Sequence, residues 1–282
     1  MFKIINKNIR LINNKMEYLF IDGSYYCFYR YFAIITWFKA SHKGEELEDP
    51  TQNEEFVEKF KKTFVLKIAE LIKKCKLNNP KIIIARDCRR ENIWRNEVFP
   101  EYKATRVYDD SFKGGSFFKM AYEGEELFKK GGYENIVRHE SLEADDCIAI
   151  MTREVLSKDP TAKITIVTSD TDYLQLMNER VSLINLKLKP VNTSKNSTGQ
   201  PKRDLFYKIV MGDKSDNIPG VFKKCGIKTA EKYYNDTVLF VEKLKAENAA
   251  HIYQRNKILV DFSKIPQELV NNFIERFQDL YL

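Results

Sequence analysis

The chain has 282 residues, 43% of them hydrophobic, which is enough to bury one large core with a smaller appended subdomain. Its 47 Lys and Arg against 40 Asp and Glu give a formal charge of +7, which is compatible with a polyanionic partner. No apolar run approaches the ~18 residues that span a bilayer, and residues 1–15 lack the apolar core of a secretion signal. We therefore expect neither a membrane-spanning helix nor a secretion signal in this sequence.

The N-terminal part of the chain alternates predicted strands with helices. The apolar run 17–21 is the first predicted strand, and it ends at Asp22. The aromatic-rich segment 25–38 is predicted to begin as a helix, and the polar segment 42–53 to be a loop. Apolar residues then recur every three or four positions, which predicts a helix over 54–75.

A second buried strand is predicted over 81–85, and Asp87 follows it. Strand, helix and strand in this order predict a parallel βαβ unit. The next segment, 88–132, alternates basic and aromatic residues, as a path for single-stranded nucleic acid requires, and Arg95 and Tyr102 are candidate contacts. The alternative is an ordinary solvated insertion, but the position directly after Asp87 favours substrate contact.

Three carboxylates mark the start of the next helix. Ser141 is the predicted N-cap, and Glu143, Asp145 and Asp146 fall in or near the first turn. One or two acids there would simply complement the helix dipole. Three repel one another unless cations neutralise them, and oxygen ligands without a histidine or cysteine pattern suit Mg²⁺ or Mn²⁺.

More acids are predicted at the same place. A third strand over 163–167 leads to Asp170 and Asp172, and Asp22 and Asp87 also follow strand ends. Each alone is typical of a turn or N-cap, but parallel strands bring their carboxyl ends to one edge of a sheet. Such a cluster can hold two divalent ions ~4 Å apart, which is a phosphodiester-cleaving arrangement. No histidine lies near these acids and no P-loop is present, which disfavours a zinc hydrolase and a nucleotide triphosphatase.

The segment 211–230 carries two further acids and a glycine turn. Asp213 and Asp216 could add distal ligands, and Gly220 and Gly226 precede a helix predicted to begin near Lys228. Backbone amides at such a helix start can hold a phosphate, and residues 202–232 have eight Lys and Arg against four acids, which fits duplex DNA binding. The alternative is a surface helical hairpin.

Taken together, these motifs resemble the 5′-nuclease superfamily, in a viral or phage-type form, which includes flap endonucleases and the 5′→3′ exonuclease domains of bacterial DNA polymerases. The matching segments follow the order of that family: 20–24, 99–106, 143–146, 168–172, 212–220 and 255–261.

The resemblance implies an α/β fold with a central, parallel-rich sheet flanked by helices (a PIN-like core), a helical arch and a helix–three-turn–helix element. It implies one metal ion at Asp22, Asp87, Glu143, Asp145 and Asp146, and a second at Asp170, Asp172, Asp213 and Asp216. Lys103 and Arg106 match arch residues that contact the scissile phosphate, and their i, i+3 spacing on a helix would let both reach one phosphate. The predicted DNA contacts at the glycine turn are Gly220, Lys223, Lys224, Gly226, Lys228 and Thr229.

Two departures from the family pattern matter. Lys223 replaces the middle glycine of the turn and one residue is inserted, which counts against the K⁺ site that the family often forms there. The segment that begins at Met16 resembles the usual start of family members, so residues 1–15 are predicted to be an N-terminal extension or a misassigned start. The predicted domains are therefore that extension, a nuclease core over 16–200 with an arch insertion at about 88–132, and a DNA-binding region with C-terminal helices over 201–282.

These observations predict a Mg²⁺-dependent 5′-nuclease, with Mn²⁺ as a substitute, that cuts branched DNA or removes nucleotides from 5′ ends in replication or repair. Three alternatives stay open: a non-catalytic DNA-binding scaffold, a PIN-type ribonuclease and an exonuclease that removes RNA from RNA–DNA primers.

Residues 267–273 faintly resemble a sliding-clamp peptide, but Ile274 stands where an aromatic belongs, so we predict an ordinary amphipathic helix. Five widely spaced cysteines without a C-x-x-C pair predict a reducing intracellular compartment (cytoplasm, nucleus or a viral replication site), and we expect a monomer.

Overall fold

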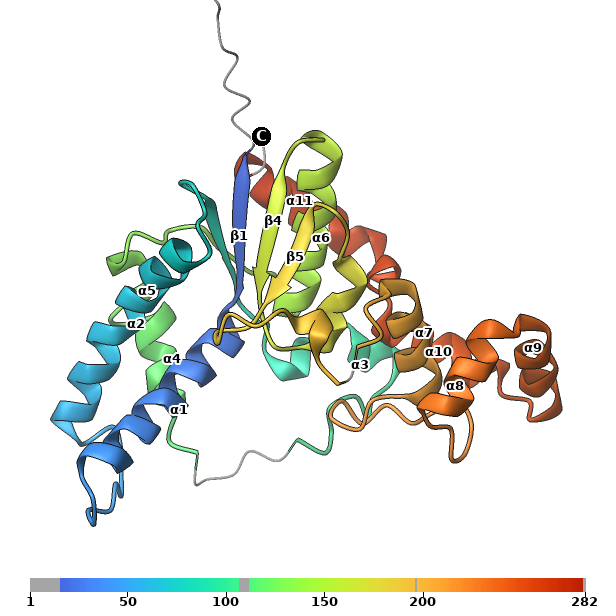
Figure 1. Cartoon of the computed structure of the whole chain (residues 1–282), viewed down its shortest axis with the longest axis horizontal. Coiled ribbons are helices and arrows are strands. Elements are labelled where there is room, and N and C mark those ends of the chain that lie inside the picture. Colours follow the sequence, from blue (N-terminus) through green and yellow to red (C-terminus); the bar gives the residue numbers. More distant parts are fainter. Residues whose placement is uncertain (1–15, 107–111, 196, 281–282) are drawn as a thin grey trace, which may run out of the picture.

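The computed structural model describes residues 16–106, 112–195 and 197–280. Its centre is a fully parallel sheet with the spatial order β3-β2-β1-β4-β5, in which the carboxyl ends of the strands share one edge (Figure 1). The strands are β1 (Glu17–Asp22), β2 (Lys81–Ala85), β3 (Ile136–Val137), β4 (Lys163–Val167) and β5 (Val181–Ile184). The predicted α/β class is confirmed, and the structure adds the short strands β3 and β5, which we did not predict.

Helices cover both faces of the sheet. Alternate side chains of β1 point to opposite sides, because successive residues of a strand face opposite ways. Tyr18 and Phe20 join the core under α6 (Ala144–Lys158), and Leu19 and Ile21 join the core under α1 (Gly23–Ser41) and α2 (Glu54–Lys74). Burial on both faces explains why these strands are almost continuously apolar.

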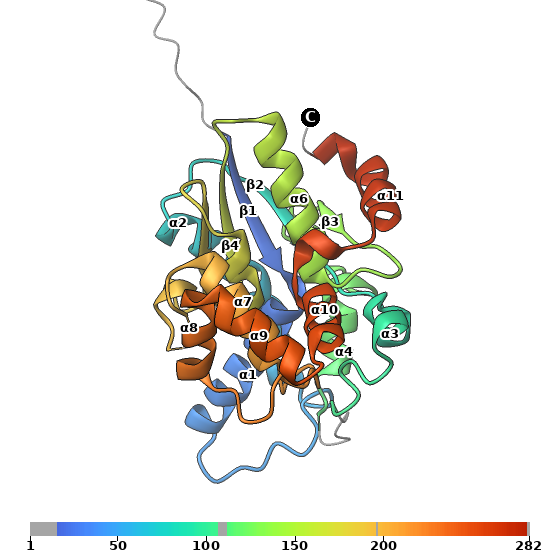
Figure 2. The same ribbon diagram turned by 90° about the vertical axis from the view of Figure 1, so that its right-hand side faces the viewer.

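The remaining helices extend these two layers. On the α1 side lie α4 (Gly115–Tyr122) and α5 (Leu127–Lys130) (Figure 1), and on the α6 side lies α11 (Gln267–Phe277), which is seen beside α6 in Figure 2. Val270 and Phe273 of α11 are buried in the α6 core, so the predicted amphipathic helix is confirmed. No helix in the described residues is long and apolar enough to cross a membrane, and all five cysteines are free thiols.

The start of α6 differs from the prediction by two residues. Glu143, and not Ser141, is the N-cap, and the helix begins at Ala144. The Asp146 carboxylate accepts a hydrogen bond from the Glu143 backbone N–H at 3.2 Å, so the acidic sequence caps its own helix. The predicted apolar face is confirmed, because Ala144, Cys147 and the following members of the pattern are buried.

The helical arch was predicted across a segment that forms only short helices where the structure describes it. These are η1 (Arg90–Asn92), α3 (Arg95–Val98), α4 and α5, and part of the predicted arch, residues 107–111, lies outside the described residues. The prediction that Lys103 and Arg106 share a helix is wrong. Lys103 has a left-handed φ of 57°, and its backbone N–H binds the carbonyl of Asp216 at 2.9 Å, so a contact with a distant segment replaces a helical turn.

Four helices form a lobe beside the sheet: α7 (Pro201–Met211), α8 (Ile227–Asn235), α9 (Thr237–Ala246) and α10 (Ala250–Val260) (Figure 1). Val210, Phe222 and Phe240 form its core. The buried Asn256 amide donates to the carbonyls of Ile209 (3.0 Å) and Pro219 (2.8 Å), which ties α10 to α7 and to the glycine turn. The helix predicted after that turn is α8. The predicted division between core and DNA-binding region stays a prediction.

Candidate active site

The carboxyl edge of the sheet collects the acids that follow its strands. Asp22 ends β1 and caps α1 by accepting from the Tyr25 N–H at 2.9 Å, and it also accepts from the Tyr173 hydroxyl at 3.2 Å. Asp87 follows β2 and accepts from the Ala144 N–H at 2.8 Å, which joins the first turn of α6 to the strand end. The predicted meeting of this edge with the start of α6 is therefore confirmed by the structure.

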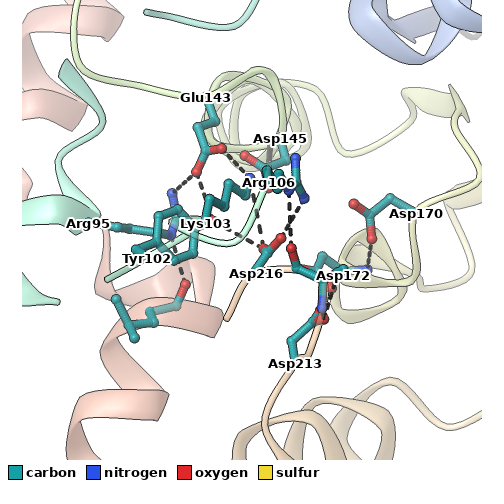
Figure 3. A network of polar contacts seen from close by, with 12 residues as sticks. Arg95, Tyr102, Lys103, Arg106, Glu143, Asp145, Asp170, Asp172, Asp213 and Asp216 are labelled. Atoms are coloured by element: carbon teal, nitrogen blue, oxygen red, sulfur yellow. Dashed lines mark hydrogen bonds and ion pairs between the residues drawn. The ribbon is translucent and has the colours of Figure 1, made fainter. Parts of the chain in front are cut away.

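Two compact groups of three carboxylates lie in the described residues. Within each group, one oxygen atom of every residue lies within 4.8 Å of those of the other two. The first group is Glu143, Asp145 and Asp146, and the second is Asp172, Asp213 and Asp216. Figure 3 shows Glu143 and Asp145 of the first group and all three members of the second. Asp22, Asp87 and Asp170 belong to neither group, although they lie at or just after the carboxyl ends of β1, β2 and β4. The structure thus divides the nine predicted ligands into two compact groups and a line of acids along the sheet edge.

A tight turn carries two members of the second group, Asp213 and Asp216. Asp213 and Ile218 exchange backbone hydrogen bonds of 2.8 and 2.7 Å across it, which directs Asp213 and Asp216 towards the sheet edge. Gly212 at its start has a φ of 75°, and a Cβ atom there would lie 2.3 Å from the Ile218 carbonyl oxygen. Only glycine satisfies both constraints without a shift of the backbone.

Burial and mutual repulsion change the acidity of this cluster. Burial raises the pKa of Asp22 to about 7, and the neighbouring Asp87 adds to this effect. Burial also raises the pKa of Asp145 well above its ordinary range, with further contributions from Asp146 and Glu143. Burial likewise raises the pKa of Asp170. Burial and mutual repulsion thus disfavour the charged form of these three carboxylates, an effect that bound cations would oppose.

Arg95 lies inside the protein and holds the first group in place. Its guanidinium makes a bidentate pair with Asp146, with both N–O distances at 2.7 Å, and a third contact of 3.1 Å to Glu143. Only 2% of the Arg95 side chain and none of the Asp146 side chain is exposed. The predicted role of Arg95 as a DNA contact does not fit this position, because a buried guanidinium that is already paired cannot reach a phosphate.

Tyr102 is buried in the same way. Its hydroxyl donates to Glu143 at 3.0 Å and to Asp216 at 3.2 Å, so it links the two groups instead of facing outward as a predicted DNA contact would. Asp146 also accepts from the Trp94 indole at 3.0 Å, so both of its oxygens are occupied by protein donors. Among the three acids of the first group, Asp146 is therefore the least available as a metal ligand.

Lys103 and Arg106 do lie at the cluster, as predicted, although not on a helix. The Lys103 ammonium pairs with Glu143 and lies 3.8 Å from Asp216, so it sits between the two groups (Figure 3). Arg106 pairs with Asp216 at 2.5 Å and donates to the Ser215 carbonyl at 3.1 Å. Burial alone would lower the pKa of Lys103, but Glu143 and Asp216 outweigh it and raise that pKa above its ordinary value.

Lys208 is a member of the site that sequence reasoning missed. From the last turn of α7 its ammonium pairs with Asp172 and with Asp213, the latter at 2.7 Å. Burial raises the pKa of Asp213, but Lys208 and the Ser215 donors outweigh it and bring that pKa to about 2. The sequence offered only a faint signal, a lysine five positions before the predicted ligand Asp213.

The predicted duplex contacts lie apart from the acids, on the lobe. Lys223, Lys224 and Lys228 are exposed, and Gly226 is the N-cap of α8. Gly220 and Thr229 flank this turn, and their predicted contacts with DNA stay predictions. The structure adds that the three exposed lysines lie next to or within the first turn of α8 and form no ion pair with any residue of the described ranges.

The all-oxygen donor set fits divalent cations. Each compact group offers three carboxylates, and no histidine or cysteine belongs to either group. Within the described residues, four basic side chains (Arg95, Lys103, Arg106 and Lys208) pair with five of the nine predicted acids, which leaves excess negative charge for hard cations to neutralise.

Comparison with known proteins gives the following similarities. A family model described as "5′-3′ exonuclease, N-terminal resolvase-like domain" matches residues 17–203. The chain is 31% identical over 228 residues to a 5′-3′ exonuclease of Bacillus subtilis, and 33% identical over 196 residues to one of Buchnera aphidicola. These alignments cover 78% and 64% of this chain, and 69% and 64% of the respective relatives.

A similar fold occurs in a crystal structure of the bacteriophage T5 flap endonuclease in a complex with DNA and metal ions. The TM-score is 0.66 at 17% identity, and the match covers 94% of this chain and 99% of that one. At this identity the likeness shows the fold alone.

Proposed function

The chain belongs to the 5′-3′ exonuclease family, and from this premise we propose that it hydrolyses DNA phosphodiesters at 5′ flaps or 5′ ends during replication or repair. The observation that carries the proposal is the pair of carboxylate groups at the carboxyl edge of the sheet, with Lys103 between them. A pair of such groups suits two divalent ions acting on one phosphate.

We assign the ions to Mg²⁺, with Mn²⁺ as a substitute. The first group with Asp22 and Asp87 would hold one ion, and the second group with Asp170 would hold the other. When bound, the ions would supply a nucleophilic hydroxide at neutral pH and stabilise the leaving oxygen. Asp146 would act mainly through its neighbours, because Arg95 and Trp94 occupy its oxygens.

The basic residues at the cluster have roles of their own. Lys103 contributes a point charge and Arg106 a planar fork, and both already lie against the carboxylates that a phosphate must approach. A phosphate at the cluster would compete with Glu143 and Asp216 for these two cations. We therefore assign Lys103 and Arg106 to binding the scissile phosphate and stabilising the charge that develops on it.

We assign the binding of duplex DNA to a different surface, at the start of α8. The exposed lysines at the start of α8 and the free backbone amides of that helix suit a DNA backbone, without selecting a sequence. The T5 flap endonuclease of similar fold is described in complex with DNA and metal ions, which supports DNA as the ligand. A K⁺ ion at this turn is not part of the proposal, because Lys223 stands where the family has glycine. We propose that the protein acts as a monomer.

The test is cleavage of labelled 5′-flap, nicked, blunt and RNA-primed duplexes in Mg²⁺ and in EDTA. We expect Mg²⁺-dependent products from the 5′ strand, and the ranking of the four substrates separates flap cleavage, exonuclease action and primer removal. Asp145→Asn should abolish hydrolysis and preserve or improve DNA affinity, because it removes negative charge facing a phosphate. Glu154→Gln, on the same helix and away from the cluster, is the matched control.

Two results would favour the alternatives. Tight DNA binding by the wild-type protein without any cleavage in Mg²⁺ would indicate a replication scaffold. Cleavage confined to RNA strands would indicate a ribonuclease. Near-normal turnover of Asp145→Asn at saturating Mg²⁺ would remove the acid cluster from the mechanism altogether.

A further inference from the structure

A cavity of about 310 Å³ adjoins the sheet edge on the β3 side. Its walls come from segments far apart in the sequence: Arg86, Asp87 and Arg89 after β2, Arg138 after β3, and Arg276 near the end of α11. Because Asp87 also belongs to the acid edge, the cavity begins where the candidate active site ends.

The cavity lining carries net positive charge, with four arginines against three acids. Glu123 is paired with Arg86 at 2.6 Å, and the Asp87 carboxylate accepts from Ser24 and from the Ala144 N–H. Burial lowers the pKa of His139, which keeps that ring neutral at pH 7. Of the acids that line the cavity, Asp87 and Glu140 then remain opposite three arginines, Arg89, Arg138 and Arg276.

Those three arginines form no ion pair among the residues that the structure describes. Arg89, Arg138 and Arg276 are exposed, and none forms a side-chain hydrogen bond or an ion pair within the described part of the chain. They reach the cavity from three separate elements, so their convergence is not a by-product of one basic stretch. Guanidinium forks arranged in this way match the oxygens of a phosphate.

A second depression adjoins both this cavity and the turn that carries Lys103. It has a volume of about 790 Å³, shares Cys88 and Arg89 with the first cavity, and has Tyr102 and Ala104 on its wall. The two hollows therefore form a track from the turn that carries Lys103 to the three arginines. A strand that leaves the cluster past Lys103 would follow this track, whereas a duplex would not fit a cavity of this size.

We propose that the arginine cavity is a binding site for a phosphate-bearing nucleotide of the 5′ strand, beyond the scissile phosphate. The inference rests on the proposed function, because it assumes that the 5′ strand of a DNA substrate is bound at the acid cluster and continues from there. The volume suits one nucleotide, since ligand pockets begin at about 300 Å³. The phosphate is either the terminal 5′-phosphate of a nicked end or an internal phosphodiester of a flap.

The experiment measures binding in EDTA, so that no hydrolysis is needed. The double variant Arg138→Gln/Arg276→Gln is compared with the wild type and with Lys163→Gln, an exposed lysine at the opposite end of the sheet. The substrates are a 5′-flap duplex, a nicked duplex with a 5′-phosphate, the same nick with a 5′-hydroxyl, and a plain duplex. Thermal midpoints of all variants check that folding is intact.

For the double variant, we expect the Kd for the flap or for the 5′-phosphate nick to rise about tenfold, roughly 1.4 kcal/mol, with the plain duplex unchanged. The salt dependence for the affected substrate should flatten by about 0.7 per lost contact with a single strand. Loss on the nick alone identifies a terminal phosphate, and loss on the flap alone an internal one.

The same Kd as wild type for the flap and for the 5′-phosphate nick, or equal weakening of all four substrates, would overturn the proposal. So would an equal effect of Lys163→Gln. A wild type that binds these substrates but never cleaves them in Mg²⁺ would instead contradict the proposed nuclease, and the binding comparison would still decide this inference.

Discussion

Replacement of Arg95 separates a structural role from a role in DNA binding. The side chain is 2% exposed and makes a bidentate pair with a fully buried Asp146, a contact with Glu143 and a hydrogen bond to the Leu259 carbonyl at 2.7 Å. In Arg95→Ala the Asp146 carboxylate stays buried without a cation to balance its charge. Removing one member of a buried ion pair costs about 3–5 kcal/mol of unfolding free energy. At roughly 2–4 °C per kcal/mol for a chain of this size, the thermal midpoint should fall by roughly 6–20 °C.

The assay is thermal unfolding followed by circular dichroism in metal-free buffer, with two matched variants. Arg86→Ala removes an ion pair that is 28% and 56% exposed on its two sides, so its effect should stay within about 1 kcal/mol. Arg95→Lys keeps the charge but loses the planar fork, and it should fall between the wild type and Arg95→Ala. A normal midpoint for Arg95→Ala together with weakened DNA binding would refute the structural reasoning and restore the role predicted from sequence.

Three further predictions concern the lysines. Lys103→Ala should lower the single-turnover cleavage rate by at least ~100-fold while the Kd for a flap changes no more than about tenfold; weak binding with normal single-turnover cleavage would make Lys103 a surface contact. Replacing Lys223, Lys224 and Lys228 together should weaken binding across sequences and flatten its salt dependence by up to about three phosphate contacts, and an unchanged slope would place the duplex anchor elsewhere. Lys208→Met should tighten Mn²⁺ binding measured by calorimetry, because the ammonium between Asp172 and Asp213 is gone; unchanged affinity would mean that Lys208 does not compete with the ion.

The parts of the fold that could be predicted from sequence are those with a local cause. The strand 163–167 is observed with the bounds predicted, and the helix predicted over 54–75 ends one residue earlier, because apolar runs and 3–4 spacing are properties of neighbouring residues. Asp22, Asp87, Asp170 and Asp172 could be placed for a related reason, since each follows a strand end and all strands are parallel. Two strands were missed because β3 has two residues and β5 four, too few to show a period.

Contacts between distant segments explain the errors. Arg95 and Asp146 are 51 positions apart, and nothing near Arg95 in the sequence distinguishes a buried arginine from an exposed one. Lys103 leaves the helical region because its backbone binds Asp216, 113 positions further along. In both cases the competing interaction belongs to the tertiary structure, which overrides local propensity.

The errors also share an electrostatic cause. Nine carboxylates at one sheet edge cannot fold together without internal cations, so basic residues that look like substrate contacts in the sequence are drawn into the cluster. Arg95 is fully enclosed and paired, Lys208 is nearly enclosed, and Arg106 keeps half of its side chain exposed. Exposure therefore ranks these cations by how readily a phosphate could recruit them. By this ranking Arg106 is the one most open to substrate, Lys103 must exchange Glu143 for a phosphate, and Arg95 serves the acids alone.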